Sequence, residues 1–290
     1  MKKVAIVTDT NSSVTIEEGR ELGVHVIPMP FYIDEKQFFE ELDLTQEGFY
    51  EYLAKGADIK TSQPAPEDVM ELWDKLLETY DEIVHIPMSS GLSGSMATAM
   101  MLSSDEPYAG RVFVVDNQRI SVTLRRAVVD AQNMANAGYD GEAIRRKLLE
   151  EKSESSIYIM MDTLYYLKKG GRITPAAAAI GTVLKIKPVL QIQGEKLDSF
   201  AKARNPKQGR EIMIKQMLND CKTRFGDPAG ANMHIDVAYT FDRETALDFK
   251  AQVQEAFPGH DIIMSPLPLS IACHIGPGAL AVASSRIVNI

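Results

Sequence analysis

The fold is decided by residues 1–27, which contain the two strings Val4-Ala5-Ile6-Val7-Thr8-Asp9 and Val24-His25-Val26-Ile27. The apolar run Val4 to Val7 is typical of a buried parallel strand, because a strand covered on both faces loses its polar alternation. Thr15 and Glu18 form a T-x-x-E capping box for a helix that ends at Gly23. Val24 to Ile27 is then the next strand, so this stretch begins a β-α repetition.

The same alternation continues through the first half of the chain. A helix is expected after Pro66, where apolar residues recur at helical spacing. Further elements follow in order: a strand Ile83 to Met88, a helix, a strand Val112 to Val115, and helices Val122 to Ala135 and Ile144 to Leu149. Such repetition predicts an α/β fold with a mostly parallel sheet and helices on both faces.

The second half of the chain has a different pattern. The expected elements are a strand Ile157 to Met160, a short helix Leu164 to Lys169 ended by Gly170-Gly171, an Ala-rich helix Pro175 to Leu184, a hairpin of Pro188 to Ile192 and Lys196 to Phe200 turned at Gly194-Glu195, a helix Arg210 to Phe225, a strand Ile235 to Thr240, a helix Glu244 to Ala256 and a strand Ile262 to Met264. We therefore expect two domains, residues 1–155 and a smaller α/β domain at 156–290.

Composition excludes several classes of protein. The chain has 290 residues, 45% hydrophobic and 24% charged, which is typical of a globular protein. A net charge of −9 argues against nucleic acid and against docking on an anionic membrane. Cys221 and Cys273 cannot build a disulfide framework or a thiolate metal cluster, which favours a reducing cytoplasm. No apolar stretch reaches the roughly 18 residues of a membrane span, so we expect no stable membrane insertion.

Three loops of the first half lie where ligands bind in open α/β sheets, between strand ends and helix starts. They are residues 8–13, residues 61–64 and Ser89-Ser90-Gly91-Leu92-Ser93-Gly94-Ser95. The last loop combines glycines with small hydroxyls at a helix start, which suits an anion. An ordinary capping turn explains the same string equally well.

Enzyme motifs are absent or incomplete. The string Gly91-Leu92-Ser93-Gly94-Ser95 lacks the second glycine of a nucleophile elbow, and no lysine follows Gly94 as a P-loop requires. The five histidines lack zinc-site spacing, and His25 and His85 lie in apolar strands as expected of satisfied core residues. A Ser93–His274 catalytic pair, as in a serine acyl hydrolase, stays open as the alternative.

A basic turn stands out in the second half, Lys168-Lys169-Gly170-Gly171-Arg172-Ile173. Basic residues at the negative end of a helix explain it, and so does an Arg172 that faces an anion or a partner. His274 is likewise set at a rigid bend, beside Gly276-Pro277-Gly278.

Taken together, these strings resemble the DegV family of bacterial fatty-acid-binding proteins. The matching pieces span nearly the whole chain in the family's order: Val7 to Thr10, Thr61 to Pro64, Ser89 to Ser95, Lys169 to Ile173 and His274 to Gly278. The resemblance implies two α/β domains that enclose one long-chain fatty acid in a tunnel, with no cofactor and no metal. It implies a carrier that is not itself an enzyme and that presents the acid to a separate fatty acid kinase for acyl-phosphate formation.

The resemblance also implies the ligand-binding residues. Thr61 and Ser93 would hydrogen-bond the carboxylate, with the neighbouring Ser62, Gly94 and Ser95, while His274 and Arg172 would frame it. Ala65 departs from the family, in which a serine often follows Thr-Ser-Gln-Pro, and this removes one hydrogen-bond donor. The segment Lys202-Ala203-Arg204 loosely matches basic residues that meet the kinase in relatives.

Overall fold

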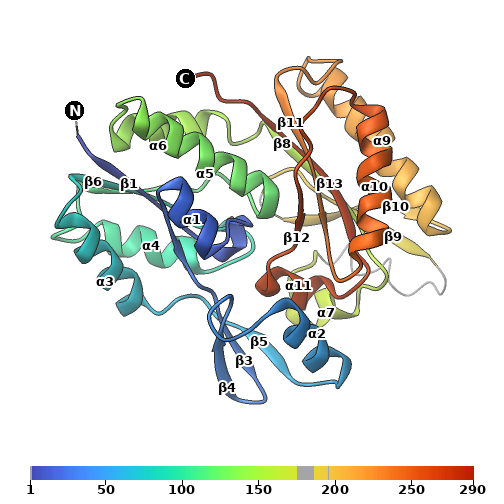
Figure 1. Ribbon diagram of the computed structural model, residues 1–290, viewed down its shortest axis with the longest axis horizontal. Helices are drawn as coiled ribbons and strands as arrows, with labels where there is room; N and C mark the ends of the chain where they lie inside the picture. Colours follow the sequence, from blue (N-terminus) through green and yellow to red (C-terminus); the bar gives the residue numbers. More distant parts are fainter. Residues whose placement is uncertain (1, 175–185, 195) are drawn as a thin grey trace. The chain divides into compact units, whose positions relative to one another are not determined.

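A computed structural model describes residues 2–174, 186–194 and 196–290 (Figure 1). The chain forms two compact units, one of residues 1–153 with 288–290 and one of residues 154–287. The expected Ala-rich helix Pro175 to Leu184 lies outside the described residues. The α/β fold class is confirmed.

The core of the first unit is a four-stranded parallel sheet. Its strands are β1 (Val4–Asp9), β2 (Val24–Ile27), β6 (Glu82–Ile86) and β7 (Val112–Val114), in the spatial order β2-β1-β6-β7. All six residues of β1 are buried, as the apolar run predicts. Strand order reverses between β1 and β6, and loops beyond the carboxyl ends of such neighbouring strands form ligand sites in open sheets.

Helices cover both faces of this sheet (Figure 1). One face packs against α3 (Pro66–Leu77) and α4 (Ser95–Ser103), with Trp73 and Met96 fully buried in that layer. The other helices of the unit are α1 (Ile16–Leu22), α5 (Ser121–Asn136) and α6 (Gly141–Glu150), and a 3-10 turn spans Thr10–Ser12. The helices therefore begin close to the ends of the strands that precede them.

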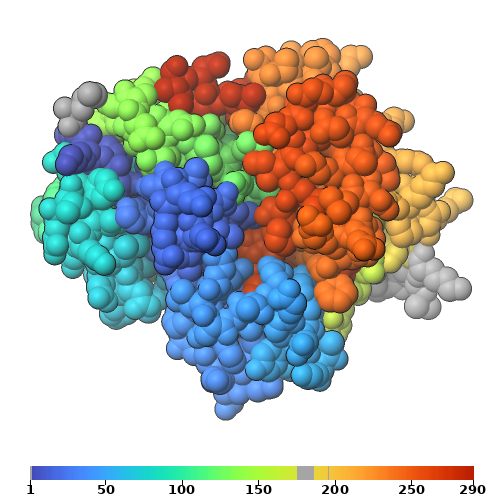
Figure 2. All heavy atoms as spheres, viewed as in Figure 1, coloured from blue at the N-terminus to red at the C-terminus, as the bar shows by residue number. Residues whose placement is uncertain are grey.

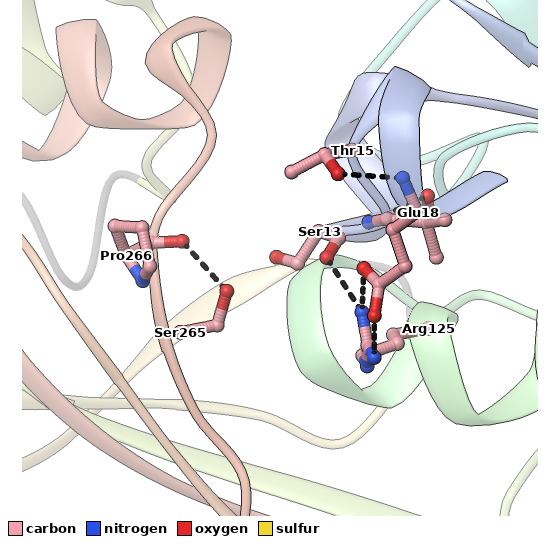
Figure 3. Close-up of polar contacts among 8 residues, drawn as sticks. Ser13, Thr15, Glu18, Arg125, Ser265 and Pro266 are labelled. Carbon is pink, nitrogen blue, oxygen red and sulfur yellow. Dashed lines mark hydrogen bonds and ion pairs between the residues drawn. The ribbon is translucent and has the colours of Figure 1, made fainter. Parts of the chain in front are cut away.

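The capping box of α1 is only half formed. Thr15 Oγ1 accepts from Glu18 N at 3.1 Å, and Gly23 ends the helix with φ 75°, as expected. The Glu18 carboxylate, which a complete box directs to the Thr15 N–H, forms an ion pair with Arg125 of α5 instead (Figure 3). The motif thus starts a helix and also ties two helices together.

The sequence patterns missed a small antiparallel sheet, which residues 30–61 form with a helix. Its strands are β3 (Pro30–Ile33), β4 (Lys36–Phe39) and β5 (Ile59–Thr61), in the order β4-β3-β5, and its helix is α2 (Gln46–Ala54). Figure 2 shows this segment in light blue as a lobe of the first unit. The sheet delivers Thr61 at the end of β5, directly before the loop that leads to α3.

The second unit is built on a six-stranded mixed sheet in the order β10-β9-β8-β13-β11-β12. Its strands are β8 (Ser155–Met160), β9 (Lys187–Ile192), β10 (Leu197–Ala203), β11 (Met233–Tyr239), β12 (Met264–Pro266) and β13 (Leu280–Arg286). Only β11 and β12 pair in parallel among these described strands. The hairpin of β9 and β10 is confirmed, whereas β12 begins two residues later than expected and β13 was missed.

Helices of the second unit complete its core and its loops. The long helices α9 (Pro206–Thr223) and α10 (Arg243–Ala256) contribute Met213, Met217 and Phe249 to the apolar layer on the sheet. The short helices α7 (Tyr165–Gly170) and α11 (Leu269–Ile275) pack against each other. These two carry or precede the residues expected to face an anion.

Candidate functional site

The Ser/Gly-rich loop and the start of α4 form one turn. Leu92 N and Ser93 N both donate to Ser89 O, at 3.0 and 3.1 Å. Ser93 Oγ lies 2.9 Å from Ser95 Oγ and accepts from Ser95 N at 3.2 Å. Ser93 is half-buried and Ser95 is buried, while Gly94 is exposed. The turn therefore gathers two hydroxyls at a helix start, where the first N–H groups lack partners within the helix.

The loop that carries Thr61 lies against this turn. Gln63 Nε2 donates to Thr98 Oγ1 on α4 at 2.9 Å. Gln63 Oε1 lies so close to Gly94 that a Cβ there would be 2.6 Å away. Thr61 is half-buried and Ser62 is exposed. The first unit thus brings the Thr61 and Ser93 loops together, and Gln63 is the contact that sequence reasoning missed.

Hydrogen bonds to Asp9, Arg119 and Asp116 hold this loop in place. Asp9, the last residue of β1, accepts from Met88 N at 3.2 Å. Ser89 N donates to Arg119 O at 3.1 Å, and Ser90 Oγ donates to Asp116 Oδ2 at 2.7 Å. The turn is therefore fixed to β1 and to the segment after β7 before α4 begins.

A small pocket of the first unit lies behind this turn. Its polar lining is Asp9, His85, Ser95 and Thr98, and apolar side chains line the rest. His85 is 3% exposed, and burial lowers its pKa to about 3, so the ring is neutral. Among the described residues Nδ1 of His85 has no hydrogen-bond partner, which corrects the expectation of a satisfied core histidine. His25 is half-buried at the edge of Tyr80, and its Nε2 also has no hydrogen-bond partner among the described residues, so the expectation is wrong for this histidine too.

The second unit brings His274 and Arg172 together around a glycine. Burial, and to a lesser degree Arg172, lowers the pKa of His274 to about 4, so the ring is neutral at ordinary pH. A Cβ on Gly170 would lie 2.0 Å from His274 Nδ1, and Arg172 Nη1 donates to Gly170 O. The basic turn thus caps α7 and also borders His274, while an Arg172 that faces an anion or a partner stays a prediction.

The loop after His274 is fixed by Thr240. Thr240 Oγ1 donates to Gly276 O at 2.7 Å and accepts from Ala279 N at 2.9 Å. Gly276 has φ 81°, and a Cβ there would lie 2.3 Å from Cδ2 of Tyr166 on α7. Glycine is therefore required at this bend by both the backbone and the aromatic neighbour.

Other kinds of site are not found in the described part of the chain. It contains no group of three or more His, Cys, Asp or Glu side chains that could hold a metal ion. Over the same residues, no helix combines the length and the hydropathy needed to cross a membrane.

Fold and site define an α/β protein of two units with a hydroxyl-rich turn at a helix start. The family model described as "Uncharacterised protein, DegV family" matches residues 3–286, and the chain belongs to this family. A DegV domain-containing protein of Clostridium acetobutylicum is 30% identical over 283 residues, covering 97% of this chain and 96% of the relative.

Two solved structures are similar to the chain at full length. One, from Thermus thermophilus, is described as "Fatty Acid Binding of a DegV family Protein"; it is 27% identical with a TM-score of 0.88 and covers 99% of this chain and 100% of its own. The other is DegV of Bacillus subtilis, described as a fatty acid binding protein, 26% identical with a TM-score of 0.86 and the same coverage.

Proposed function

We propose that this protein binds one long-chain fatty acid and holds its carboxylate with Thr61 and Ser93. The observation that carries the proposal is the joined turn of Ser93, Gly94 and Ser95 at the start of α4, against which the Thr61 loop rests through Gln63. Two full-length relatives described as fatty-acid-binding support it. Ser62, Gly94 and Ser95 complete the proposed ligand-binding residues of the first unit, and we propose His274 and Arg172 as those of the second unit.

The two ends of the ligand have different energetic roles. Hydrogen bonds from hydroxyls to a carboxylate contribute about 1.5–3 kcal/mol each. Burial of a tail of ~15 methylenes contributes on the order of 12 kcal/mol before the cost of ordering and association. The tail therefore sets affinity, the hydroxyls set orientation, and the proposed tunnel must extend well beyond the small pocket behind Ser95.

The head-group assignment is tested by titrating hexadecanoic acid into Ser93→Ala and Thr61→Ala. Each variant should weaken binding by about 1–3 kcal/mol and leave the fold intact, because one charge-assisted bond to the ligand is lost and no core atom changes. Ser103→Ala is the matched control, since its hydroxyl donates to Met100 O within the same helix. Unchanged affinity in both site variants would refute the assignment. Mass spectrometry of a solvent extract of the purified protein identifies any acid bound in the cell.

We also propose that a separate fatty acid kinase is the partner. It would dock on the surface of this protein that carries the exposed Lys202 and Arg204. Charge is divided unequally between the units, which supports this assignment. Residues 154–287 hold 16 Lys and Arg against 13 Asp and Glu, whereas the rest of the chain holds 15 against 27. Lys202→Glu with Arg204→Glu should slow acyl-phosphate formation by the kinase and leave fatty-acid affinity unchanged.

In this proposal the protein is a carrier and not a serine hydrolase. A hydrolase needs a base on the nucleophile, whereas the hydrogen bonds given above join Ser93 Oγ to Ser95. A serine-directed fluorophosphonate should therefore leave Ser93 unlabelled. Stoichiometric labelling there would establish the hydrolase instead.

A further inference from the structure

Asp9 occupies an unusual position for a carboxylate. It ends β1 and is 1% exposed, below the turn that carries Ser93 and Ser95. Its Oδ1 accepts from Asn11 N at 3.0 Å, and its Oδ2 accepts from Met88 N at 3.2 Å. Met88 directly precedes residues 89–95, so one buried side chain joins the loop after β1 to the head-group turn.

The groups around Asp9 are mostly neutral polar groups and not charged side chains. Burial raises its pKa to about 6, and the hydrogen bonds from Met88 and Asn11 oppose that rise. His85 of β6 shares its pocket and is neutral above about pH 3. On the adjoining segment Glu40 is buried and accepts from the hydroxyl of Thr10. The neighbours from α4, Ser95 and Thr98, do not titrate in this range.

We propose that Asp9 is a positioning residue for the head-group turn: its carboxylate holds residues 89–95 in the ligand-binding conformation, and protonation releases them. This inference rests on the proposed function. A carboxylate offers an acceptor oxygen to each of the two N–H groups, whereas a carboxylic acid turns one of those oxygens into a hydroxyl. One buried N–H then loses its strong acceptor, and the turn is free to move.

The consequence for the ligand is a pH-dependent affinity. Binding of hexadecanoic acid to the natural protein should weaken several-fold as pH falls from 7.5 to 5.5. In Asp9→Asn an amide nitrogen replaces one acceptor, so affinity at pH 8 should fall by about tenfold. The pH dependence that remains in Asp9→Asn belongs to the groups that the two proteins share, among them the ligand's own carboxylate and Asp130, whose pKa burial raises to about 7. The difference between the two profiles therefore measures Asp9.

Hydrogen exchange on the natural protein without ligand tests whether the Asp9 carboxylate fixes the turn, and it needs no variant. Ile83 N is the internal reference, since it donates to the carbonyl of Arg111, which does not titrate, and lies outside residues 89–95. Relative to Ile83, the protection of the Met88 or the Asn11 amide should fall several-fold between pH 7.5 and 5.5. The proposal is overturned if both ratios stay constant, or if Asp9→Asn binds at pH 8 as tightly as the natural protein. Absence of fatty-acid binding at every pH would instead refute the proposed function, and the exchange ratios would still decide whether Asp9 holds the turn.

Discussion

The two units position their proposed ligand-binding residues by opposite means. In the first unit the turn at Ser93 is uncharged and is fixed by buried hydrogen bonds, which Met88 N donates to Asp9 and Ser89 N donates to Arg119 O. In the second unit a neutral His274 and a charged Arg172 gather around Gly170, which leaves room for the histidine ring. The first arrangement should therefore be sensitive to protonation, and the second to added volume.

The largest expected effect tests whether the second unit is sensitive to added side-chain volume. Gly276→Ala should destabilise the protein by about 3–4 kcal/mol, because φ is 81° and the new Cβ would lie 2.3 Å from the Tyr166 ring. Gly171→Ala is the matched control, with φ 67° and, among the described residues other than its chain neighbours, no atom within 4 Å of its Cβ, and should cost about 1 kcal/mol. Denaturant unfolding measures both. Equal costs would mean that backbone conformation alone, and not packing on Tyr166, requires glycine at the bend.

The next effect tests whether the first unit is sensitive to protonation of Asp9. Because the folded-state pKa of Asp9 is raised from 3.8 to about 6, the native state binds the proton more tightly than the unfolded chain does. Protonated Asp9 therefore stabilises the folded protein fully below about pH 4. This contribution is lost as pH rises through 6, and the free energy of unfolding falls by up to about 3 kcal/mol.

Asp9→Asn lacks this titration. The free energy of unfolding of the variant minus that of the natural protein should therefore rise by up to about 3 kcal/mol between pH 4 and 7. Thermal unfolding at several pH values measures the difference, and Ser90→Ala is a control on the same turn that keeps Asp9. A difference that does not change with pH would show that Asp9 ionises in the folded protein as readily as in the unfolded chain. Together with the expected loss of ligand affinity, a gain in stability would mark Asp9 as a residue kept for function.

Local patterns predicted the elements whose signals are local. The run Val4 to Val7 and the cap at Thr15 gave β1 and α1, because burial and capping are visible within a few residues. The hairpin of β3 and β4 was missed because its turn, Asp34-Glu35, has φ 48° and 69° without the glycine that usually marks such a turn. β13 was missed because the bend at Gly276 interrupts the apolar pattern before it.

The site residues show the same difference between features visible in a short stretch of sequence and contacts between distant residues. The turn at Ser93 was recognisable because its hydroxyls and glycines are contiguous. The bond from Met88 to Asp9 joins residues 79 apart, and that from Gln63 to Thr98 joins residues 35 apart. No spacing rule connects such pairs, since segments far apart in the sequence meet only once the unit has folded.

The smallest expected effect concerns the contact between the two head-group loops. Gly94→Ala places a Cβ 2.6 Å from Gln63 Oε1, the end of a flexible side chain, so stability should fall by less than about 1 kcal/mol. Fatty-acid affinity should fall a few-fold, because Gln63 must move and takes the Thr61 loop with it. In a Gln63→Ala background the same glycine substitution meets no such atom and should leave affinity unchanged. A double-mutant cycle on ligand affinity isolates this coupling. Additive effects would mean that the Thr61 and Ser93 loops act independently, and the first unit would then hold its anion with two separate loops and not with one joined surface.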